Sequence, residues 1–238
     1  MKILVLGDIH GRTFWKNIIE KENPDLTIFL GDYVTTHEFI TPEQQINNLV
    51  DIIDYKCNNW NKVIMLRGNH DTQCLGYSWA ECYPDEPEVQ EFMSEIHFKE
   101  QFLHCTQWVY ETDKFVFAHA GISDVWMKNI KCETTDDINK LPPSAKFGFW
   151  PIRMSDYSGT SGTQPCTWIR PETLIYHFWG TKPQIVGHST KLLLQPFHSI
   201  DENDEIGPDL WVCDTLGQGY YMTIVDDEII VKNIKDEN

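Results

Sequence analysis

The sequence lacks both a long apolar run and a secretory leader. No stretch approaches the roughly 20 apolar residues that cross a bilayer. The opening segment is apolar from Ile3 to Leu6 and then meets an acid at Asp8, which is too early for a signal peptide. These absences predict a cytoplasmic protein that does not enter a membrane.

Paired cysteines are also missing. The chain has seven cysteines, an odd number, and no Cys-x-x-Cys or similar zinc-binding spacing. A disulfide framework and a structural zinc site built on thiolates are therefore not expected. We expect most of these thiols to be free and buried.

Basic residues are scarce. The chain has 19 Lys and Arg against 36 Asp and Glu, for a net charge of -17 at pH 7. Such a protein repels a phosphate backbone at long range, so an extended nucleic-acid surface is not expected. It can still hold an anionic substrate where bound cations invert the local field.

The remaining composition is that of a folded protein. Hydrophobic residues make up 41% of the chain and aromatic residues 13%, which excludes a disordered chain. A length of 238 residues suits one domain with a full hydrophobic core. We predict a single domain that spans residues 1–238.

Three short apolar runs read as buried strands, and each ends at polar residues. These runs are Lys2 to Leu6, Asp25 to Leu30 and Lys62 to Leu66. A helix is predicted over Thr13 to Glu22, and a second helix begins at the capping box Thr41-Pro42-Glu43-Gln44. Strands that alternate with helices indicate a parallel sheet core, whose ligands belong at the carboxyl ends of the strands.

The rest of the chain gives weaker signals. We predict a helix from about Glu86 to Leu103, a hairpin over residues 109–118 and a long loop from Leu141 to Pro171. The tail from Leu210 to Ile234 reads as a β-meander that turns at Asp226-Asp227.

Residues that can bind metals follow several of the apolar runs. Glycine stands directly before four of these positions, which suits backbone that turns sharply or approaches a ligand closely. Each motif alone also fits an ordinary turn or a core histidine, but five such coincidences in one chain favour a metal site. Carboxylate, imidazole and amide ligands without thiolate suit manganese, iron or zinc. The residues are Asp8, His10, Asp32, Asn69, His70, His119 and His188.

These segments resemble the five sequence blocks of the calcineurin-like metallophosphoesterases, in the family's order. Within that superfamily, Leu66 to His70 and Gly31 to Val34 also look like the branch of serine/threonine phosphoprotein phosphatases and symmetrical dinucleoside tetraphosphatases. The segments are Gly7-Asp8-Ile9-His10-Gly11, Gly31-Asp32, Gly68-Asn69-His70-Asp71, His119-Ala120-Gly121 and Gly187-His188.

The resemblance implies a four-layer αββα sandwich with two mixed β-sheets and a centre of two divalent metal ions. Manganese is the first expectation, with iron or zinc as alternatives. Asp8 and His10 would hold one ion, and Asp32 would bridge both. Asn69, His119 and His188 would hold the other ion. Some branches carry a further histidine where this chain has Thr190, so the first ion would have three protein ligands.

The resemblance also implies how a phosphate ester is cleaved. A hydroxide that bridges the two metals attacks phosphorus, and His70 protonates the leaving group as general acid. Arg170 would bind phosphate, because its planar fork grips two oxygens. A purely structural role is the alternative for each of these two residues. Arg12 and Arg67 are weaker candidates for phosphate binding.

One departure affects the substrate. The phosphoprotein phosphatases continue Gly-Asp-x-x with Asp-Arg-Gly, whereas this chain continues with Thr35-Thr36-His37. The missing acid would have oriented the catalytic histidine, so we expect Asp71, His37 or Glu38 to take its place. The specificity for phosphoproteins is left open by this change.

We therefore predict a metallophosphatase that hydrolyses phosphomonoesters, either a phosphoprotein or a small phosphate ester. The alternative is a phosphodiesterase of dinucleoside polyphosphates or cyclic nucleotides. A degenerate, non-catalytic scaffold is a third reading. It is disfavoured because such a protein would be expected to have lost metal ligands, and all six are present.

Overall fold

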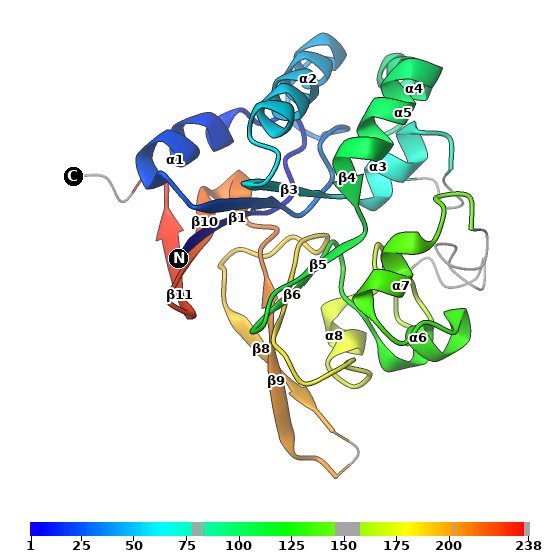
Figure 1. Ribbon diagram of the computed structural model, residues 1–238, viewed down its shortest axis with the longest axis vertical. Coiled ribbons are helices and arrows are strands. Elements are labelled where there is room, and N and C mark those ends of the chain that lie inside the picture. The colour runs from blue at the N-terminus through cyan, green and yellow to red at the C-terminus, as the bar shows by residue number, and fades with distance from the viewer. Residues whose placement is uncertain (78–81, 83, 146–157, 202, 236–238) are drawn as a thin grey trace.

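The computed structural model describes residues 1–77, 82, 84–145, 158–201 and 203–235. Two mixed β-sheets pack face to face, and helices cover their outer faces (Figure 1). The predicted fold class is confirmed. In the part of the chain that the structure describes, no helix has both the length and the apolar character that a membrane span requires.

The first sheet has the strand order β11-β10-β1-β2-β3-β4. Its parallel strands are β1 (Lys2–Leu6), β2 (Leu26–Phe29), β3 (Val63–Leu66) and β4 (Thr106–Gln107). The antiparallel strands β10 (Tyr220–Val225) and β11 (Glu228–Asn233) complete the β1 edge. The first three predicted strands are thus confirmed, and they run in parallel as expected.

Helices α1 (Phe14–Glu22) and α2 (Pro42–Asn58) connect these parallel strands and lie on the outer face of the first sheet (Figure 1). The predicted capping box starts α2. Thr41 Oγ1 accepts a hydrogen bond from the Gln44 amide at 3.3 Å, and Gln44 Oε1 accepts one from the Thr41 amide at 2.9 Å. Both donors would otherwise be unpaired at the helix start.

The second sheet has the order β5-β6-β7-β9-β8. Its strands are β5 (Val109–Glu111), β6 (Val116–Ala118), β7 (Gln184–Val186), β8 (Pro196–Ile200) and β9 (Ile206–Val212). Helices α6 (Asp124–Ile130), α7 (Thr135–Lys140) and α8 (Pro171–Leu174) lie beside its outer face. Strands β5 and β6 form the predicted hairpin.

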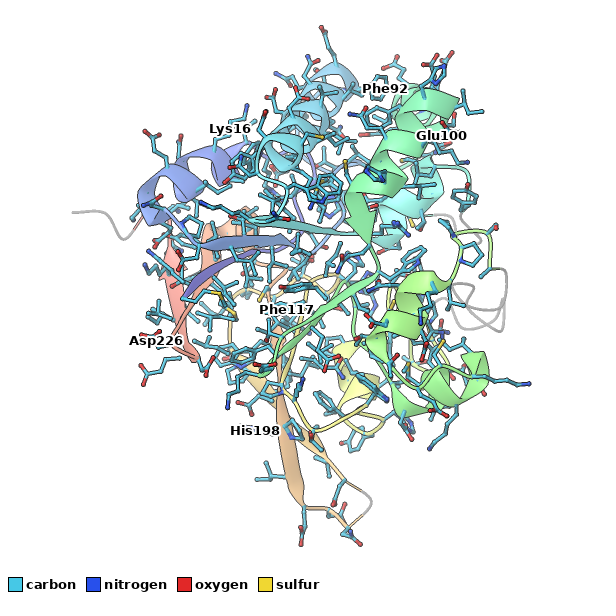
Figure 2. The ribbon with its side chains drawn as sticks, in the orientation of Figure 1. Lys16, Phe92, Glu100, Phe117, His198 and Asp226 are labelled. Atoms are coloured by element: carbon cyan, nitrogen blue, oxygen red, sulfur yellow. The ribbon has the colours of Figure 1, made fainter. Side chains whose placement is uncertain are left out.

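Alternating side chains build the layers. Ile3 and Val5 point between the sheets, where they share a cluster with Phe117 (Figure 2). Leu4 and Leu6 point the other way, into the cluster under α1 and α2. Successive residues of a strand face opposite sides, so a run that is apolar at every position places β1 between two hydrophobic layers.

The predicted helix over residues 86–103 is wrong as a single element. It is two helices, α4 (Pro87–Ser94) and α5 (Ile96–Cys105), because Glu95 takes an extended conformation with ψ 132°. The break lets the Phe92 and Phe98 rings pack 4.4 Å apart. Residues six apart on one straight helix would point about 120° away from each other.

The tail is a hairpin rather than a meander. Strands β10 and β11 pair around Asp226-Asp227 as predicted. However, β9 pairs with β7 and β8 in the other sheet. The chain crosses between sheets through residues 213–219, which include buried Asp214 and Thr215. Periodicity alone does not reveal such a change of sheet.

Two other expectations concern the loop and the thiols. The described parts of the predicted loop, 141–145 and 158–171, contain no helix or strand until Pro171, which begins α8. Residues 146–157 lie outside the described residues. All seven cysteines are free thiols, and most are buried.

A buried carboxylate ties the first helix to the sheet. Glu22 accepts hydrogen bonds from Tyr221 Oη at 2.8 Å and from Lys232 Nζ at 2.8 and 2.9 Å, and it pairs with Lys2 Nζ at 2.6 Å. Burial alone would raise the pKa of Glu22. The bonds to Lys2, Lys232 and Tyr221 outweigh burial and lower the pKa to about 2.

We expect Glu22→Gln to destabilise the fold by about 3 kcal/mol at pH 7. A depressed pKa contributes stability above the unfolded value of 4.5 that is lost as pH falls toward about 2. The difference in the free energy of unfolding between wild type and Glu22→Gln should therefore shrink to roughly half by pH 3. Urea unfolding at pH 7, 5, 4 and 3 measures it. Glu20→Gln, at an exposed position of the same helix, is the control and should change little. A difference that is independent of pH would contradict the assignment.

Candidate metal centre

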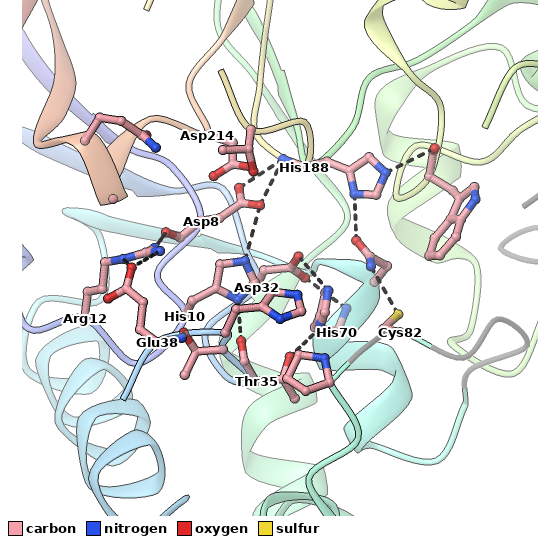
Figure 3. A pocket seen from close by; sticks show the side chains of 18 of the residues that line it. Asp8, His10, Arg12, Asp32, Thr35, Glu38, His70, Cys82, His188 and Asp214 are labelled. Carbon is pink, nitrogen blue, oxygen red and sulfur yellow. Dashed lines mark hydrogen bonds and ion pairs between the residues drawn. The ribbon is translucent and has the colours of Figure 1, made fainter. Parts of the chain in front are cut away.

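The carboxyl ends of strands from both sheets meet at one cavity of about 570 Å³ (Figure 3). Asp8 and His10 follow β1, and Asp32 follows β2. His119 follows β6 and His188 follows β7, so both sheets contribute to one site. All the predicted site residues lie at the cavity or directly behind it.

The segment after β3 is helical. Asn69 begins the short helix α3 (Asn69–Cys74), so the block Gly68-Asn69-His70-Asp71 lies at the start of a helix. Asp71 at its third position accepts a hydrogen bond from the Gly68 amide at 2.8 Å. This start of a helix turns the side chains of Asn69 and His70 toward the cavity.

The candidate ligand atoms fall into two groups that share one carboxylate. Asp8, His10 and Asp32 offer one set of atoms within 4.8 Å of one another. Asp32, His119 and His188 offer the second set, within the same limit. The position of Asp32 in both groups is the arrangement that a bridging ligand requires.

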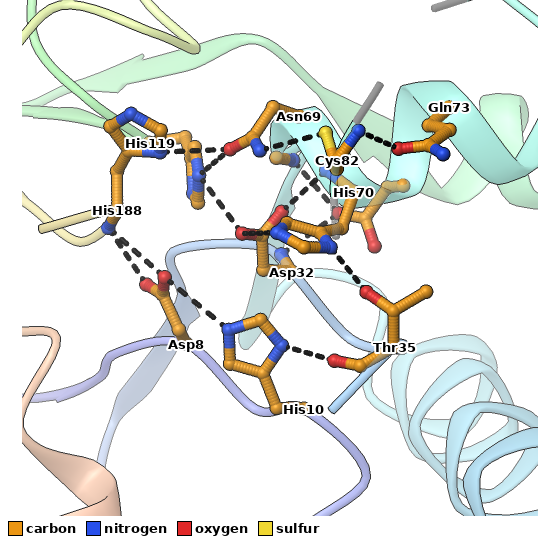
Figure 4. A network of polar contacts seen from close by, with 12 residues as sticks. Asp8, His10, Asp32, Thr35, Asn69, His70, Gln73, Cys82, His119 and His188 are labelled. Carbon is orange, nitrogen blue, oxygen red and sulfur yellow. Dashed lines mark hydrogen bonds and ion pairs between the residues drawn. The ribbon is translucent and has the colours of Figure 1, made fainter. Parts of the chain in front are cut away.

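Asn69 lies with the second group (Figure 4). Its Oδ1 is 2.8 Å from His119 Nε2 and 2.8 Å from His188 Nδ1. Its Nδ2 donates to Cys82 Sγ at 3.2 Å, which keeps the amide oxygen turned toward the two imidazoles. The residues that the sequence assigns to the second ion therefore converge.

The three histidines are oriented as metal ligands are. His10 Nδ1 donates to Thr35 O at 2.6 Å, and His119 Nδ1 donates to Leu30 O at 2.8 Å. His188 Nε2 faces Trp168 O at 3.2 Å. A carbonyl can only accept, so each contact leaves the opposite ring nitrogen with its lone pair toward the cluster. Such carbonyl partners accompany metal-bound imidazoles, and the donor set therefore fits a pair of divalent cations.

Two of the predicted glycines allow the carboxylates to approach the backbone. A Cβ on Gly68 would lie 2.0 Å from Asp32 Oδ1, and one on Gly187 would lie 2.0 Å from Asp8 Oδ1. Any other residue would displace these acids. Asp32 and His188 themselves take left-handed backbone, with φ 49° and 63°. Such conformations persist where the surroundings fix them.

The pKa values of Asp8 and Asp32 shift in opposite directions, because their charged neighbours differ. Burial and the neighbouring Asp214 raise the pKa of Asp8 well above its usual range. Burial also opposes ionisation of Asp32, but His119 and His70 outweigh it and hold its pKa below the usual value. Burial would lower the pKa of His119, yet Asp32 raises it to about 10. Asp32 Oδ2 and His119 Nε2 lie 3.4 Å apart.

The pKa values of His188 and His70 shift in the opposite direction from that of His119. Burial lowers the pKa of His188 well below its usual range, and the neighbouring charges of His119 and Arg170 add to that shift. Burial likewise lowers the pKa of His70 to about 4, against the effect of Asp32. Neutral imidazoles are the form that can accept a cation.

Asp71 supports the backbone rather than His70. Its carboxylate accepts hydrogen bonds from the amides of Asp32 and Tyr33, each at 2.9 Å, and of Gly68 at 2.8 Å. Burial and Asp32 raise its pKa to about 7. The side chain that lies against His70 Nδ1 is instead Thr35, through Oγ1. The structure places Thr35 Oγ1 at the ring nitrogen for which Asp71, His37 or Glu38 was expected.

The three arginines have different settings. Arg170 lines the cavity, and its Nη1 donates to His188 O and Ser189 Oγ, each at 3.1 Å. Arg12 also lines the cavity, but its Nε and Nη2 both donate to Glu38 Oε1, at 2.8 and 2.7 Å. Arg67 is buried against Trp108, where it bonds Thr106.

Sequence reasoning missed Asp214. It lines the cavity beside Asp8 and accepts a hydrogen bond from Thr190 Oγ1 at 2.6 Å. The signal was present, because Asp214 follows the apolar run that ends β9. The same pattern of strand and then acid that revealed Asp8 would have found it.

Comparisons with known proteins agree with this architecture. A family model described as calcineurin-like phosphoesterase matches residues 1–178. The cold-active protein-tyrosine phosphatase of a psychrophilic Shewanella species is 16% identical, with a TM-score of 0.62 over 98% of this chain and 77% of that chain. A protein serine/threonine phosphatase from Saccharomyces cerevisiae is 16% identical, with a TM-score of 0.59 over 100% of this chain and 81% of that one.

A metallophosphoesterase from Sphaerobacter thermophilus is more distant. It is 13% identical, with a TM-score of 0.53 over 99% of this chain and 89% of that one. No curated protein matches the sequence. At these identities the structural likeness concerns the fold.

The shared position of Asp32 predicts how metal binding responds to mutation. After loading with Mn²⁺ and removal of excess metal, wild type should retain two ions per chain, measured by inductively coupled plasma mass spectrometry. Asp32→Asn should lose most of both, since it removes the carboxylate common to the two groups. His10→Asn should lose one ion only, because His10 belongs to one group. Two ions retained by Asp32→Asn would contradict a bridging role.

Proposed function

This chain belongs to the calcineurin-like phosphoesterase family, and we propose that it is a metal-dependent phosphatase that hydrolyses phosphomonoesters. The observation that carries the proposal is the pair of ligand groups that share Asp32, with His70 and Arg170 lining the same cavity. A pair of metals needs a shared ligand, and phosphoryl transfer needs both an acid and an anion clamp beside it.

Asp8 and His10 would hold one cation, Asn69, His119 and His188 the other, and Asp32 both. Manganese is the proposed metal, with iron or zinc as alternatives. When bound, such a pair lowers the pKa of water and neutralises the charge of the phosphoryl oxygens. Asp71 would hold the Asp32 backbone in register, through its bond to the Asp32 amide at 2.9 Å.

His70 is the proposed proton donor to the leaving oxygen. Its Nδ1 is occupied by Thr35, so Nε2 is the nitrogen that can deliver a proton. Nε2 lies 3.9 Å from Asp32 Oδ2, and this carboxylate favours the charged ring while burial disfavours it.

Arg170 is the proposed phosphate clamp. Its Nη1 is anchored to His188 O and Ser189 Oγ, which fixes the plane of the guanidinium at the cavity wall. Both partners are neutral, so the positive charge is left for an anion. A guanidinium fork presents two parallel donors to phosphate oxygens.

The substrate is proposed to be a phosphoprotein or a small phosphate ester. Two solved structures of similar fold are a protein-tyrosine phosphatase and a serine/threonine phosphatase, which favours this class. A metal-loaded enzyme should be offered phosphopeptides, an alkyl phosphate, a dinucleoside tetraphosphate and bis-p-nitrophenyl phosphate. Preference for either of the last two would replace the proposal with a phosphodiesterase. Inactivity on all of them with two metals bound would favour a scaffold.

His70→Asn should separate proton transfer from metal binding. Turnover of an alkyl phosphate, whose leaving group needs a proton, should fall by roughly 10²- to 10⁴-fold. p-Nitrophenyl phosphate, which leaves as a stabilised anion, should lose much less, while both metals stay bound. Steady-state kinetics on the two substrates with metal analysis measures this. Equal losses on both substrates would reassign His70 to a positioning role.

Arg170→Ala should weaken transition-state binding while the metals stay in place. We expect kcat/KM to fall roughly 30- to 150-fold, because a charge-assisted fork is lost. This corresponds to a loss of about 2–3 kcal/mol of transition-state stabilisation. Arg170→Lys keeps the charge but not the fork, and it should recover only part of the loss. Lys191→Ala, at a surface ion pair with Glu172, is the control. Unchanged kcat/KM in Arg170→Ala would make Arg170 structural.

A further inference from the structure

Thr35 contacts two residues of the site, His10 and His70, although it is itself neither a predicted ligand nor a predicted acid (Figure 4). Its amide donates to Gln45 Oε1 at 2.7 Å, and its carbonyl accepts from His10 Nδ1 at 2.6 Å. Its Oγ1 lies against His70 Nδ1. One residue therefore holds a candidate ligand and the candidate acid at once.

The backbone of Thr35 is strained. It takes a left-handed conformation with φ 59°, which is rare for a β-branched residue. Such a conformation is unfavourable and persists only where the surroundings fix it. Strain of this kind at the edge of a site suggests that the position serves the site.

The Gln45 side chain fixes the backbone of Thr35. This side chain lies on α2 and is 0% exposed. Besides the Thr35 amide, it binds Ile40 O at 3.0 Å and Glu86 Oε1 at 3.1 Å through Nε2. The loop that carries Thr35 is thereby tied to a long helix, and Thr35 itself is only 2% exposed.

The hydroxyl has a definite effect on the histidine. A ring that donates Nδ1–H to Thr35 Oγ1 has one orientation and one free nitrogen, Nε2, which faces Asp32 Oδ2 at 3.9 Å. A hydroxyl achieves this without a negative charge. It therefore orients the ring while leaving Asp32 as the nearest carboxylate partner that the structure records for His70.

We propose that Thr35 is the positioning residue of His70: its hydroxyl accepts the Nδ1 hydrogen and aims Nε2 at the leaving group. This inference rests on the proposed role of His70 as proton donor. It assigns to an uncharged side chain the task that the related phosphatases give to an acid.

Thr35→Val tests the proposal, because it keeps the shape and removes the hydroxyl. Turnover of the alkyl phosphate should fall about 10²-fold, as expected when a reacting group is misaimed. KM, the two bound metals and p-nitrophenyl phosphate turnover should change little. Thr35→Ser restores the hydroxyl and should restore alkyl phosphate turnover. A purely structural role would lower both activities, metal content and thermal stability together, and that result overturns the proposal.

The double variant Thr35→Val/His70→Asn separates this idea from the proposed function. Two residues that act as one unit are not additive, so the double variant should be no slower than His70→Asn. Additive losses overturn the role of Thr35. If His70→Asn loses alkyl phosphate turnover selectively and Thr35→Val does not, the positioning role of Thr35 is wrong while the proposed role of His70 stands. If His70→Asn shows no selectivity, both assignments fail.

A spectroscopic measurement gives a readout apart from activity. In the zinc-loaded protein, ¹⁵N NMR of the histidine rings should show His70 Nδ1 protonated and hydrogen-bonded. That resonance should shift in Thr35→Val and return in Thr35→Ser, while the signals of His119 and His188 stay in place. An unchanged His70 spectrum in Thr35→Val overturns the proposal.

Discussion

The burial of Asp32 is the constraint on which the rest of the site depends. A carboxylate out of water is costly unless it is paired and hydrogen-bonded. Here its side chain accepts the His70 amide at 2.9 Å and faces His119 Nε2 at 3.4 Å. Its backbone is held by Asp71, and Gly68 has no side chain to push it away. These contacts give the Asp32 carboxylate partners for its charge, a fixed backbone and the space that its side chain requires.

Much of this could be predicted because it follows from strand ends. The carboxyl ends of parallel strands share an edge, so Asp8 and Asp32 had to lie near each other once β1 and β2 were recognised. Glycine before each acid gave a second, independent signal. The structure explains it, because a Cβ on Gly7 would lie 1.9 Å from Cys213 O and one on Gly31 would lie 2.7 Å from Gly68 N. The two-sided apolar runs likewise specified the layers.

The features that escaped prediction depend on tertiary contacts. The break at Glu95 accompanies the packing of Phe92 against Phe98, and the change of sheet after β9 has no periodic signature. Thr35 is the clearest case. Its role follows from a left-handed backbone and a bond to Gln45, ten residues away, neither of which is visible in Gly31-Asp32-Tyr33-Val34-Thr35. An alignment of motifs registers only that an acid is missing there.

The charges around the cavity bear on the size of the substrate. Arg12 is already engaged by Glu38, and Asp214 adds a negative charge beside Asp8. Arg170, by contrast, is anchored to a carbonyl and a hydroxyl. Among the described residues, Arg170 is the cationic side chain best placed to meet an anion next to the ligand groups. A polyphosphate chain would need further cations beyond its first phosphoryl group, where the described part of the wall offers Glu38 and Asp214. This distribution of charge supports the proposed substrate class, which carries one phosphoryl group.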